Sequence, residues 1–295
     1  MGTGNRGPGP GLGGTRRGVL AGAAAGIGSL LVPKGIISTA TAAQPDEGAL
    51  VVPPWDDVPV CTPSPTDRAG QGPFFIHDGE RGDDVSLYRQ DIRGRYDPSA
   101  EPGTELQLHL RVLSAADQQC SAAPLRDVEI YVWHCDAQGF YSGFGEPGEQ
   151  TPDEVYRFRP NHNDLDNNTR FCRGAGVSDA GGVVSFRTIF PGWYNGRDIH
   201  IHVMVLKRGS APLGRARYRG GDHLYTTQLY FEPELIDRVH KAAEPYRRRT
   251  ALPAYAGLIL GDERGASGLR MKASFGNGVA VARMQLLIDP SQSRV

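Results

Sequence analysis

Apolar residues recur at every second position in several short segments of this chain, and this spacing most constrains its fold. In segment 106–112 the apolar residues are Leu106, Leu108, Leu110 and Val112. Successive side chains of a β-strand point to opposite faces of a sheet, so this spacing predicts a strand with one buried face. Glycine and proline separate such segments. Many short strands between turns of this kind predict an all-β protein, a β-sandwich of mostly antiparallel strands with long loops.

The same reasoning predicts the other regular elements. Further strands are expected over 128–134, 183–188, 200–206, 224–231 and 279–288. The glycine-containing segment 178–182 is expected to be a hairpin turn between two strands. One short helix is predicted to open with segment 232–235 and to run to about Ala243, because proline is favoured in a first helical turn and acidic residues are favoured at its positive end.

A histidine pair in the predicted strand 200–206 is the strongest sign of a metal site. His200 and His202 are two residues apart, so their imidazoles should project side by side. Two imidazoles on one face can bind one metal ion. A single H-x-H motif on a strand, however, is more often packed in the core or exposed to solvent than bound to a metal. Tyr194 lies just upstream, and binding to a highly charged ion lowers the pKa of a hard donor such as a phenol. The combination favours ferric iron over zinc.

A second candidate phenolate donor is Tyr141. It follows the predicted strand 128–134 and a predicted turn from Asp136 to Gly139, so it should emerge just past that turn. Two other histidines, His134 and His223, are expected to be packed or on the surface rather than bound to a metal.

These motifs resemble those of the intradiol ring-cleavage dioxygenases, the catechol and protocatechuate dioxygenase-like family, in its secreted single-domain branch. A tyrosine after a D-x-x-G turn, a P-G-x-Y element and an R-x-x-H-x-H element occur here in the family's order. The resemblance covers roughly Cys61 to Phe231. The family holds Fe(III) through two tyrosines and two histidines. The resemblance therefore implies four metal ligands here: Tyr141, Tyr194, His200 and His202.

The resemblance extends to other residues of the site. Arg197 falls on the family's arginine beside the metal, and Gln228 falls on its active-site glutamine. Segment 72–75 resembles a family loop motif, with Gln71 where a glutamate is usual. Segment 171–174, with the sequence Phe-Cys-Arg-Gly, resembles the F-L-R-G of the secreted branch, with a cysteine in place of an aliphatic residue.

The resemblance also implies a reaction, the cleavage of catechol-type aromatic diols with O2 to muconate-type diacids. Tyr194 would leave the metal and take a catechol proton, while Tyr141 would stay bound. Arg197 and Gln228 would stabilise negative charge that develops on the substrate. One alternative is a secreted non-catalytic β-sandwich binding module, against which the four candidate ligands argue. Another is a zinc hydrolase or Fe(II) oxygenase, but these normally use histidine with a carboxylate.

The N-terminal region predicts export. Arg16 and Arg17 form a twin-arginine pattern before a weakly apolar stretch, and small residues follow at 40–43. This order predicts a twin-arginine signal peptide over 1–43, then an extended linker over 44–65 and the β-sandwich domain over 66–295. The apolar stretch is shorter than the ~20 residues of a membrane span. We therefore expect a secreted protein with no stable membrane anchor after signal cleavage.

The charge balance limits the classes of molecule that the protein is expected to bind, and the cysteines bear on disulfide formation. The chain has 32 basic and 33 acidic residues and a net charge of −1. This balance predicts no nucleic-acid partner. A catechol-type small molecule and O2 are the expected partners, and the sequence does not determine the oligomeric state or which catechol is used. Outside the cytoplasm, four cysteines predict at least one disulfide, and three pairings stay open among Cys61, Cys120, Cys135 and Cys172.

Overall fold

A computed structural model describes residues 50–55, 66, 68–76, 87–93, 103–115, 122–144, 165, 167–194, 197–207, 221–250 and 269–291. The chain divides into a unit over Met1–Glu47 and a unit over Gly48–Val295, and all described residues belong to the second unit. The predicted signal peptide and most of the predicted linker lie outside the described residues. Within the described ranges, no helix has both the length and the apolar character needed to cross a bilayer.

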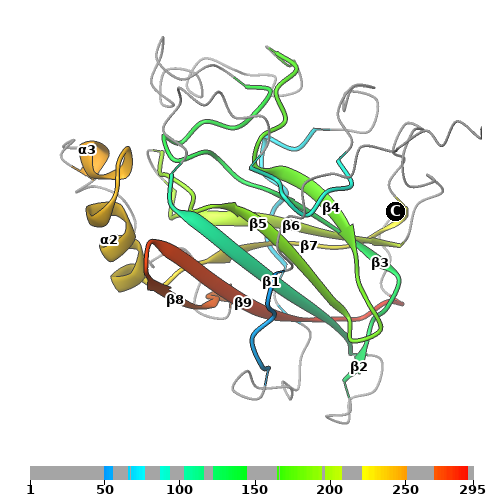
Figure 1. The fold of residues 1–295 in the computed structure, drawn as a ribbon. Helices are drawn as coiled ribbons and strands as arrows, with labels where there is room; N and C mark the ends of the chain where they lie inside the picture. The colour runs from blue at the N-terminus through cyan, green and yellow to red at the C-terminus, as the bar shows by residue number, and fades with distance from the viewer. Residues whose placement is uncertain are drawn as a thin grey trace, which may run out of the picture. The chain divides into compact units, whose positions relative to one another are not determined.

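Two β-sheets form the described part of the chain, as the sequence predicts (Figure 1). The four-stranded sheet is antiparallel throughout, in the order β4 (Arg173–Val177), β3 (Val128–Trp133), β6 (His200–Lys207) and β7 (His223–Tyr230). The five-stranded sheet has the order β2 (Ala123–Pro124), β1 (Glu105–Ser114), β9 (Val279–Ile288) and β8 (Lys272–Gly276), with β5 (Val183–Ile189) also paired to β1. The β1–β9 pair is parallel.

The sandwich core lies between the two sheets and is largely aliphatic. Leu108 of β1, Ile130 of β3 and Val203 of β6 are fully buried within it. Burial of one such side chain contributes about 1.5–3 kcal/mol. Ile201 and Val203 face this core. His200 and His202 alternate with them along the strand, so their side chains must face the other way.

One polar link crosses the sandwich core. The Nδ1 of His134, just after β3, lies 2.7 Å from the carbonyl oxygen of Cys135, so Nδ1 carries the hydrogen. Its Nε2 accepts from Oγ1 of Thr188 in β5 at 2.8 Å. Burial lowers the pKa of His134 to about 4. His134 and His223 were each expected to be packed or on the surface; His134 is packed, and His223 lies 2.7 Å from Oγ1 of Thr226.

The turn at 178–182 joins two sheets rather than two paired strands. The Asp179 N–H donates to the carbonyl of Val183 at 3.0 Å, and Gly182 has a φ of 76°, a conformation that glycine adopts readily. However, β4 pairs with β3, whereas β5 pairs with β1. The predicted hairpin is therefore wrong in its pairing, because the chain crosses from one sheet to the other at this turn.

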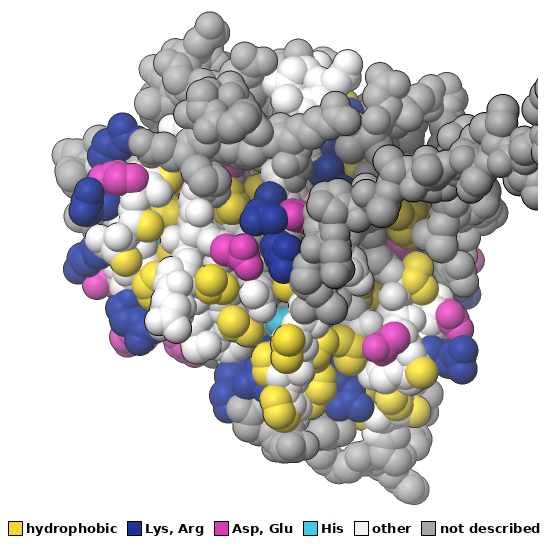
Figure 2. All heavy atoms as spheres, in the orientation of Figure 1, with side chains coloured by type: hydrophobic (Ala, Val, Ile, Leu, Met, Phe, Trp, Pro, Cys, Tyr) yellow, Lys and Arg dark blue, Asp and Glu magenta, His cyan; other side chains and the backbone are white. Residues whose placement is uncertain are grey.

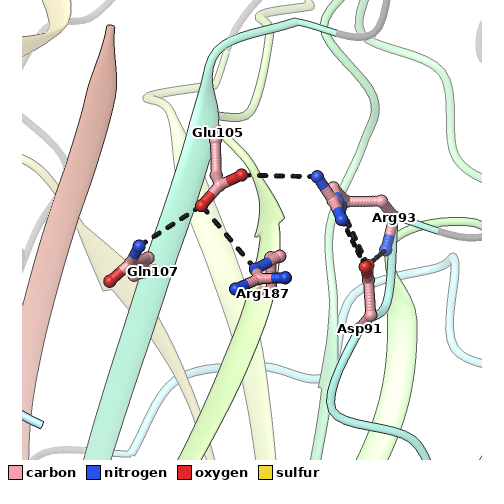
Figure 3. A network of polar contacts seen from close by, with 5 residues as sticks. All are labelled: Asp91, Arg93, Glu105, Gln107 and Arg187. Carbon is pink, nitrogen blue, oxygen red and sulfur yellow. Dashed lines mark hydrogen bonds and ion pairs between the residues drawn. The ribbon is translucent and has the colours of Figure 1, made fainter. Parts of the chain in front are cut away.

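Segment 87–93 connects the edge strands of the two sheets. Tyr88 bridges to β4 and Asp91 bridges to Arg187 of β5. A polar network holds the segment in place (Figure 3). Arg93 donates to Asp91 and pairs with Glu105 of β1 at 3.3 Å. On the face drawn in Figure 2, described basic and acidic side chains are interspersed rather than gathered by sign.

The predicted helix is α2 (Pro233–Ala242), which packs Leu235, Ile236 and Val239 against the sandwich core. A second short helix, α3 (Tyr246–Thr250), follows it and was not predicted. Strands β2 and β8 were also not predicted.

The cysteines bear on the predicted disulfide. Neither Cys135 nor Cys172 is in a disulfide, and both are buried. Burial strongly raises the pKa of the Cys172 thiol. Cys61 and Cys120 lie outside the described residues.

Candidate metal centre

One row of residues across the four-stranded sheet organises the site. Trp133 of β3 lies opposite Arg173 of β4 on one side and opposite His202 of β6 on the other, and His202 lies opposite Gln228 of β7. Residues in register on neighbouring strands share a face. The prediction that His200 and His202 project from the same face is confirmed, and that face is turned away from the sandwich core.

Tyr141 is placed by the predicted turn. The Asp136 carboxylate accepts the N–H of Gln138 at 2.8 Å and the N–H of Phe140 at 2.9 Å. Gly139 has a φ of 94°, which glycine adopts without steric cost. The chain therefore turns back on itself, and Tyr141 emerges directly after the turn, fully buried.

Tyr194 is placed by a contact with that same turn. The Gly192 N–H donates to the carbonyl of Asp136 at 2.8 Å, and the Cys135 thiol donates to the carbonyl of Gly192 at 3.4 Å. A Cβ at Gly192 would lie 2.4 Å from the carbonyl oxygen of Ala137. Only glycine allows this approach, so the two tyrosine-bearing segments are held together.

The four predicted ligands bring their donor atoms together. Oη of Tyr141 lies 3.3 Å from Nε2 of His200 and 3.1 Å from Nε2 of His202. Oη of Tyr194 lies 3.4 Å from Nε2 of His200, and the two Nε2 atoms are 3.0 Å apart. Donors at about 2.0–2.1 Å from one metal are about 2.9–3.4 Å apart at bond angles of about 90–110°. The spacing therefore fits a single ion.

The protonation of the histidines also fits a metal. Nδ1 of His200 lies 2.6 Å from the carbonyl oxygen of Asp198, which can only accept, so Nδ1 carries the hydrogen and Nε2 keeps its lone pair. Burial, followed by the nearby charges of His200 and Arg197, lowers the pKa of His202 well below its ordinary value. Neutral imidazole is the form that binds metals.

The chemistry of the donors favours a highly charged ion. Two phenol oxygens and two imidazole nitrogens make up the set, and phenolate is a hard donor. Among the described residues, no group of three or more histidine, cysteine, aspartate or glutamate side chains could hold a metal. At this site the two tyrosines join the two histidines, and the set suits ferric iron.

Aromatic rings cover the four donors. This aromatic cluster comprises Phe74, Phe75, Tyr131, Trp133, Tyr141, Phe144 and Tyr194. Phe74 stacks on Tyr141 with ring centroids 4.4 Å apart, and Trp133 stacks on His202 at 4.8 Å. Gly72 has a φ of 72°, and a Cβ there would lie 2.9 Å from Cε1 of His202. The 72–75 segment singled out in the sequence is thus a wall of the site.

The structure also brings Arg197 and Gln228 together. The Arg197 guanidinium donates to Oε1 of Gln228 at 2.5 Å, and the Tyr230 hydroxyl donates to the same oxygen at 3.1 Å. The Gln228 amide nitrogen donates to the carbonyl of Gly70 at 2.6 Å. Two donors and one acceptor fix the orientation of the amide. Because Gln228 lies opposite His202 across β6 and β7, this polar group stands beside the donor set.

Three residues of the site were not predicted for this role: Trp133, Arg173 and Tyr230. Each is brought to the donor set by the pairing of its strand with a neighbouring strand. The sequence indicates which residues of one strand share a face, but it does not indicate which residues of two strands lie opposite each other.

Comparison with known proteins agrees with this architecture. No protein-family model and no curated protein sequence matches the chain. The intradiol ring-cleavage dioxygenase from Tetranychus urticae is similar in structure, with 20% sequence identity, a TM-score of 0.54, and 78% of this chain and 97% of that chain covered. A second dioxygenase structure matches with 21% identity, a TM-score of 0.55, and coverage of 79% and 98%. These two likenesses show that the chain has the fold of the intradiol ring-cleavage dioxygenases.

Proposed function

We propose that this protein is a non-heme Fe(III) intradiol dioxygenase that cleaves catechol-type diols with O2 to muconate-type diacids. The observation that carries the proposal is the convergence of Tyr141, Tyr194, His200 and His202, with four of the distances between their donor atoms at 3.0–3.4 Å. The matched dioxygenase folds support the same reaction class. When held by these four residues, ferric iron would act as a Lewis acid toward the diol.

The two tyrosines differ in burial, which supports different roles. Tyr141 is 0% exposed and Phe74 stacks on its ring, whereas Tyr194 is 8% exposed. The family resemblance assigns to Tyr194 the role of the phenolate that turns away from the donor set, and its slightly greater exposure agrees with that role. Its Oη would then accept a proton from the incoming diol, as a general base. Tyr141 would keep its place and hold the site together.

Arg197 and Gln228 would act on the substrate. A guanidinium keeps its charge at all accessible pH values and presents a rigid fork of donors. Gln228 fixes one of its nitrogens through Oε1, so the guanidinium is oriented before substrate arrives. A donor fixed in this way stabilises negative charge without reorganisation during the reaction.

The aromatic cluster would keep water from the reacting atoms. Phe74 and Trp133 cover one tyrosine and one histidine of the donor set. A site closed in this way strengthens the electrostatic interactions of its charged groups.

Export by the twin-arginine route is part of the proposal and rests on Arg16 and Arg17. Replacing both by lysine should keep the protein in the cytoplasm, as cell fractionation would measure. Unchanged export would contradict the assignment of the signal.

The proposal is tested by metal analysis, absorption and oxygen uptake. We expect about one iron per chain, a visible band from tyrosinate-to-Fe(III) charge transfer, and O2 uptake with catechols that gives a ring-opened diacid. Stoichiometric zinc without iron would refute the metal assignment. Iron without O2 uptake on any catechol would favour the non-catalytic binding module.

The division of roles between the tyrosines has its own test. Tyr194→Phe should keep iron but turn over slowly, and its substrate complex should keep the Tyr141 band. Tyr141→Phe should lose more of the visible absorption in that complex. Identical spectra of the two substrate-bound variants would contradict the assignment.

A further inference from the structure

Arg173 is a fully buried arginine beside the donor set. It begins β4, in register with Trp133 and in the same row as His202. Its Nε donates to Oγ of Ser142 at 2.8 Å, and its Nη2 donates to the carbonyl of Ser142 at 3.0 Å. Its Nη1 has no hydrogen-bond partner among the described residues.

No carboxylate pairs with this guanidinium in the described part of the chain. Arg93, by contrast, pairs with both Asp91 and Glu105. A buried charge without an opposite charge is costly, because the interior replaces water poorly. Burial accordingly lowers the pKa of Arg173. A guanidinium does not lose its proton inside a protein, so Arg173 needs a compensating negative charge.

Three groups near Arg173 can carry that charge. They are Tyr131, Tyr141 and Cys172, whose anionic forms would each stabilise the guanidinium. Burial strongly raises the pKa of Cys172, so that thiol stays neutral. Tyr131 interacts with the guanidinium more strongly than Tyr141 does, but it is not among the four converging donors, so a metal at this site would not hold it as an anion. Tyr141 is one of them, and the Arg173 Cζ lies 5.9 Å from the centroid of its ring.

We propose that Arg173 is a positioning residue of the metal centre, whose buried charge compensates the phenolate that Tyr141 becomes when it binds the metal. This inference rests on the proposed function, because it needs a metal-bound Tyr141. The hydrogen bonds to Ser142 hold the guanidinium next to the residue that follows Tyr141. Arg173 touches neither substrate nor metal and acts through Tyr141.

This role makes Arg173 matter differently in the two forms of the protein. In this proposal, Tyr141 brings a negative charge to the guanidinium only when it is bound to the metal. With metal, the charges of Arg173 and Tyr141 attract each other in a medium of low dielectric constant. The cation also stabilises the phenolate electrons, so its removal should shift the tyrosinate-to-iron absorption to longer wavelength.

The test compares Arg173→Met and Arg173→Lys with Arg89→Met as a matched control. Arg89 is a suitable control because its guanidinium also donates to backbone carbonyls, those of Arg170 and Arg173. Iron affinity is measured against a competing chelator, the absorption maximum is recorded, and thermal unfolding is followed with and without iron. Arg173→Met should bind iron at least about tenfold more weakly, with its band at longer wavelength. Arg173→Lys should recover most of the affinity, and Arg89→Met should change neither property.

Several results would overturn the inference. One is unchanged affinity and absorption in Arg173→Met. Another is an equal loss of stability with and without iron, or failure of the metal-free variant to fold, since each indicates a purely structural role. A third is an Arg173→Lys protein as weak as Arg173→Met, which would make the hydrogen-bonding fork the important feature. If the wild-type protein itself binds no iron, the proposed function fails instead.

Discussion

The two faces of the four-stranded sheet differ in the kind of packing they support. The inner face joins the sandwich core, where aliphatic side chains such as Ile130 and Val203 are buried. The polar link there is satisfied, since both nitrogens of His134 have partners. The outer face carries the aromatic cluster and the donor set.

The outer face leaves buried polar atoms unsatisfied. Nε1 of Trp133, Nη1 of Arg173 and Nδ1 of His202 have no hydrogen-bond partner among the described residues. Buried polar groups in proteins are nearly always paired, and exceptions need an explanation. The comparison teaches that one sheet can serve two purposes: its inner face stabilises the fold, and in the proposed function its outer face keeps polar groups in place for chemistry.

Substitutions at two neighbouring residues of β6, one on each face of the sheet, test whether the two faces have separate roles. We expect the largest effect from these substitutions. His202→Ala should abolish iron binding, colour and turnover, because it removes one of four donors. Ile201→Ala should cost about 2–5 kcal/mol of unfolding free energy through the cavity it leaves, yet retain iron. Iron content and urea unfolding would measure both effects. If His202→Ala keeps its colour, or Ile201→Ala loses iron while folded, the two faces are not separable.

Arg197→Ala is the next largest expected effect. Loss of one preorganised donor typically lowers turnover ~10²–10³-fold. Iron and colour should persist, and catechol affinity should stay within about tenfold, which is about 1.4 kcal/mol. Stopped-flow mixing of the anaerobic catechol complex with oxygenated buffer measures the affected step. An unchanged rate with O2 would remove Arg197 from catalysis and leave it as a support of Gln228.

The sandwich core should show its own dependence on pH. The pKa of His134 is about 4 in the folded protein, against about 6.5 in the unfolded chain. The unfolded chain therefore takes up a proton first as pH falls. Neutral His134 therefore contributes on the order of 3 kcal/mol to the free energy of unfolding. This contribution is fully present above about pH 6.5 and is lost as the pH falls toward about 4.

His134→Gln isolates this contribution, because glutamine can form hydrogen bonds but does not titrate. Urea unfolding at pH 7 and pH 4.5 would give the difference between the two proteins. The variant should lose less stability than the wild type on acidification. Equal losses in both proteins would mean that other groups, such as those on the outer face, control the acid sensitivity.

Local patterns in the sequence predicted the strands of the sandwich well. Alternation over 106–112 predicted β1, which the structure extends to Glu105–Ser114, and 200–206 predicted β6. Strand β8 was missed although a signal was present. Asn277 and Gly278 both have positive φ and join β8 to β9, and Asn-Gly is the strongest short-range hairpin signal.

The candidate site was only partly readable from local patterns. The parity of a strand indicates that His200 and His202 share a face, but it does not say what covers that face. The approach of Tyr194 to Tyr141 depends on the Gly192–Asp136 hydrogen bond, which joins segments far apart in the chain. Only the resemblance to a family predicted that approach. Likewise, Arg173 enters the site through the register of β4 and β3.

The smallest effect that we predict concerns single hydroxyl groups on the two sides of the sheet. Tyr230 donates to Oε1 of Gln228 on the outer side, whereas Tyr246 donates to the carbonyl of Phe190 in the sandwich core. A neutral hydrogen bond contributes about 0.5–1.5 kcal/mol. Tyr230→Phe should therefore lower turnover by about 2–10-fold and keep iron, because Gln228 retains its bonds to Arg197 and Gly70. Tyr246→Phe should lower unfolding free energy by a similar amount and leave turnover unchanged. Steady-state kinetics and urea unfolding of both variants would show whether loss of a hydroxyl lowers turnover on the outer side and unfolding free energy on the inner side. A Tyr230→Phe enzyme that loses stability but not turnover would contradict this rule.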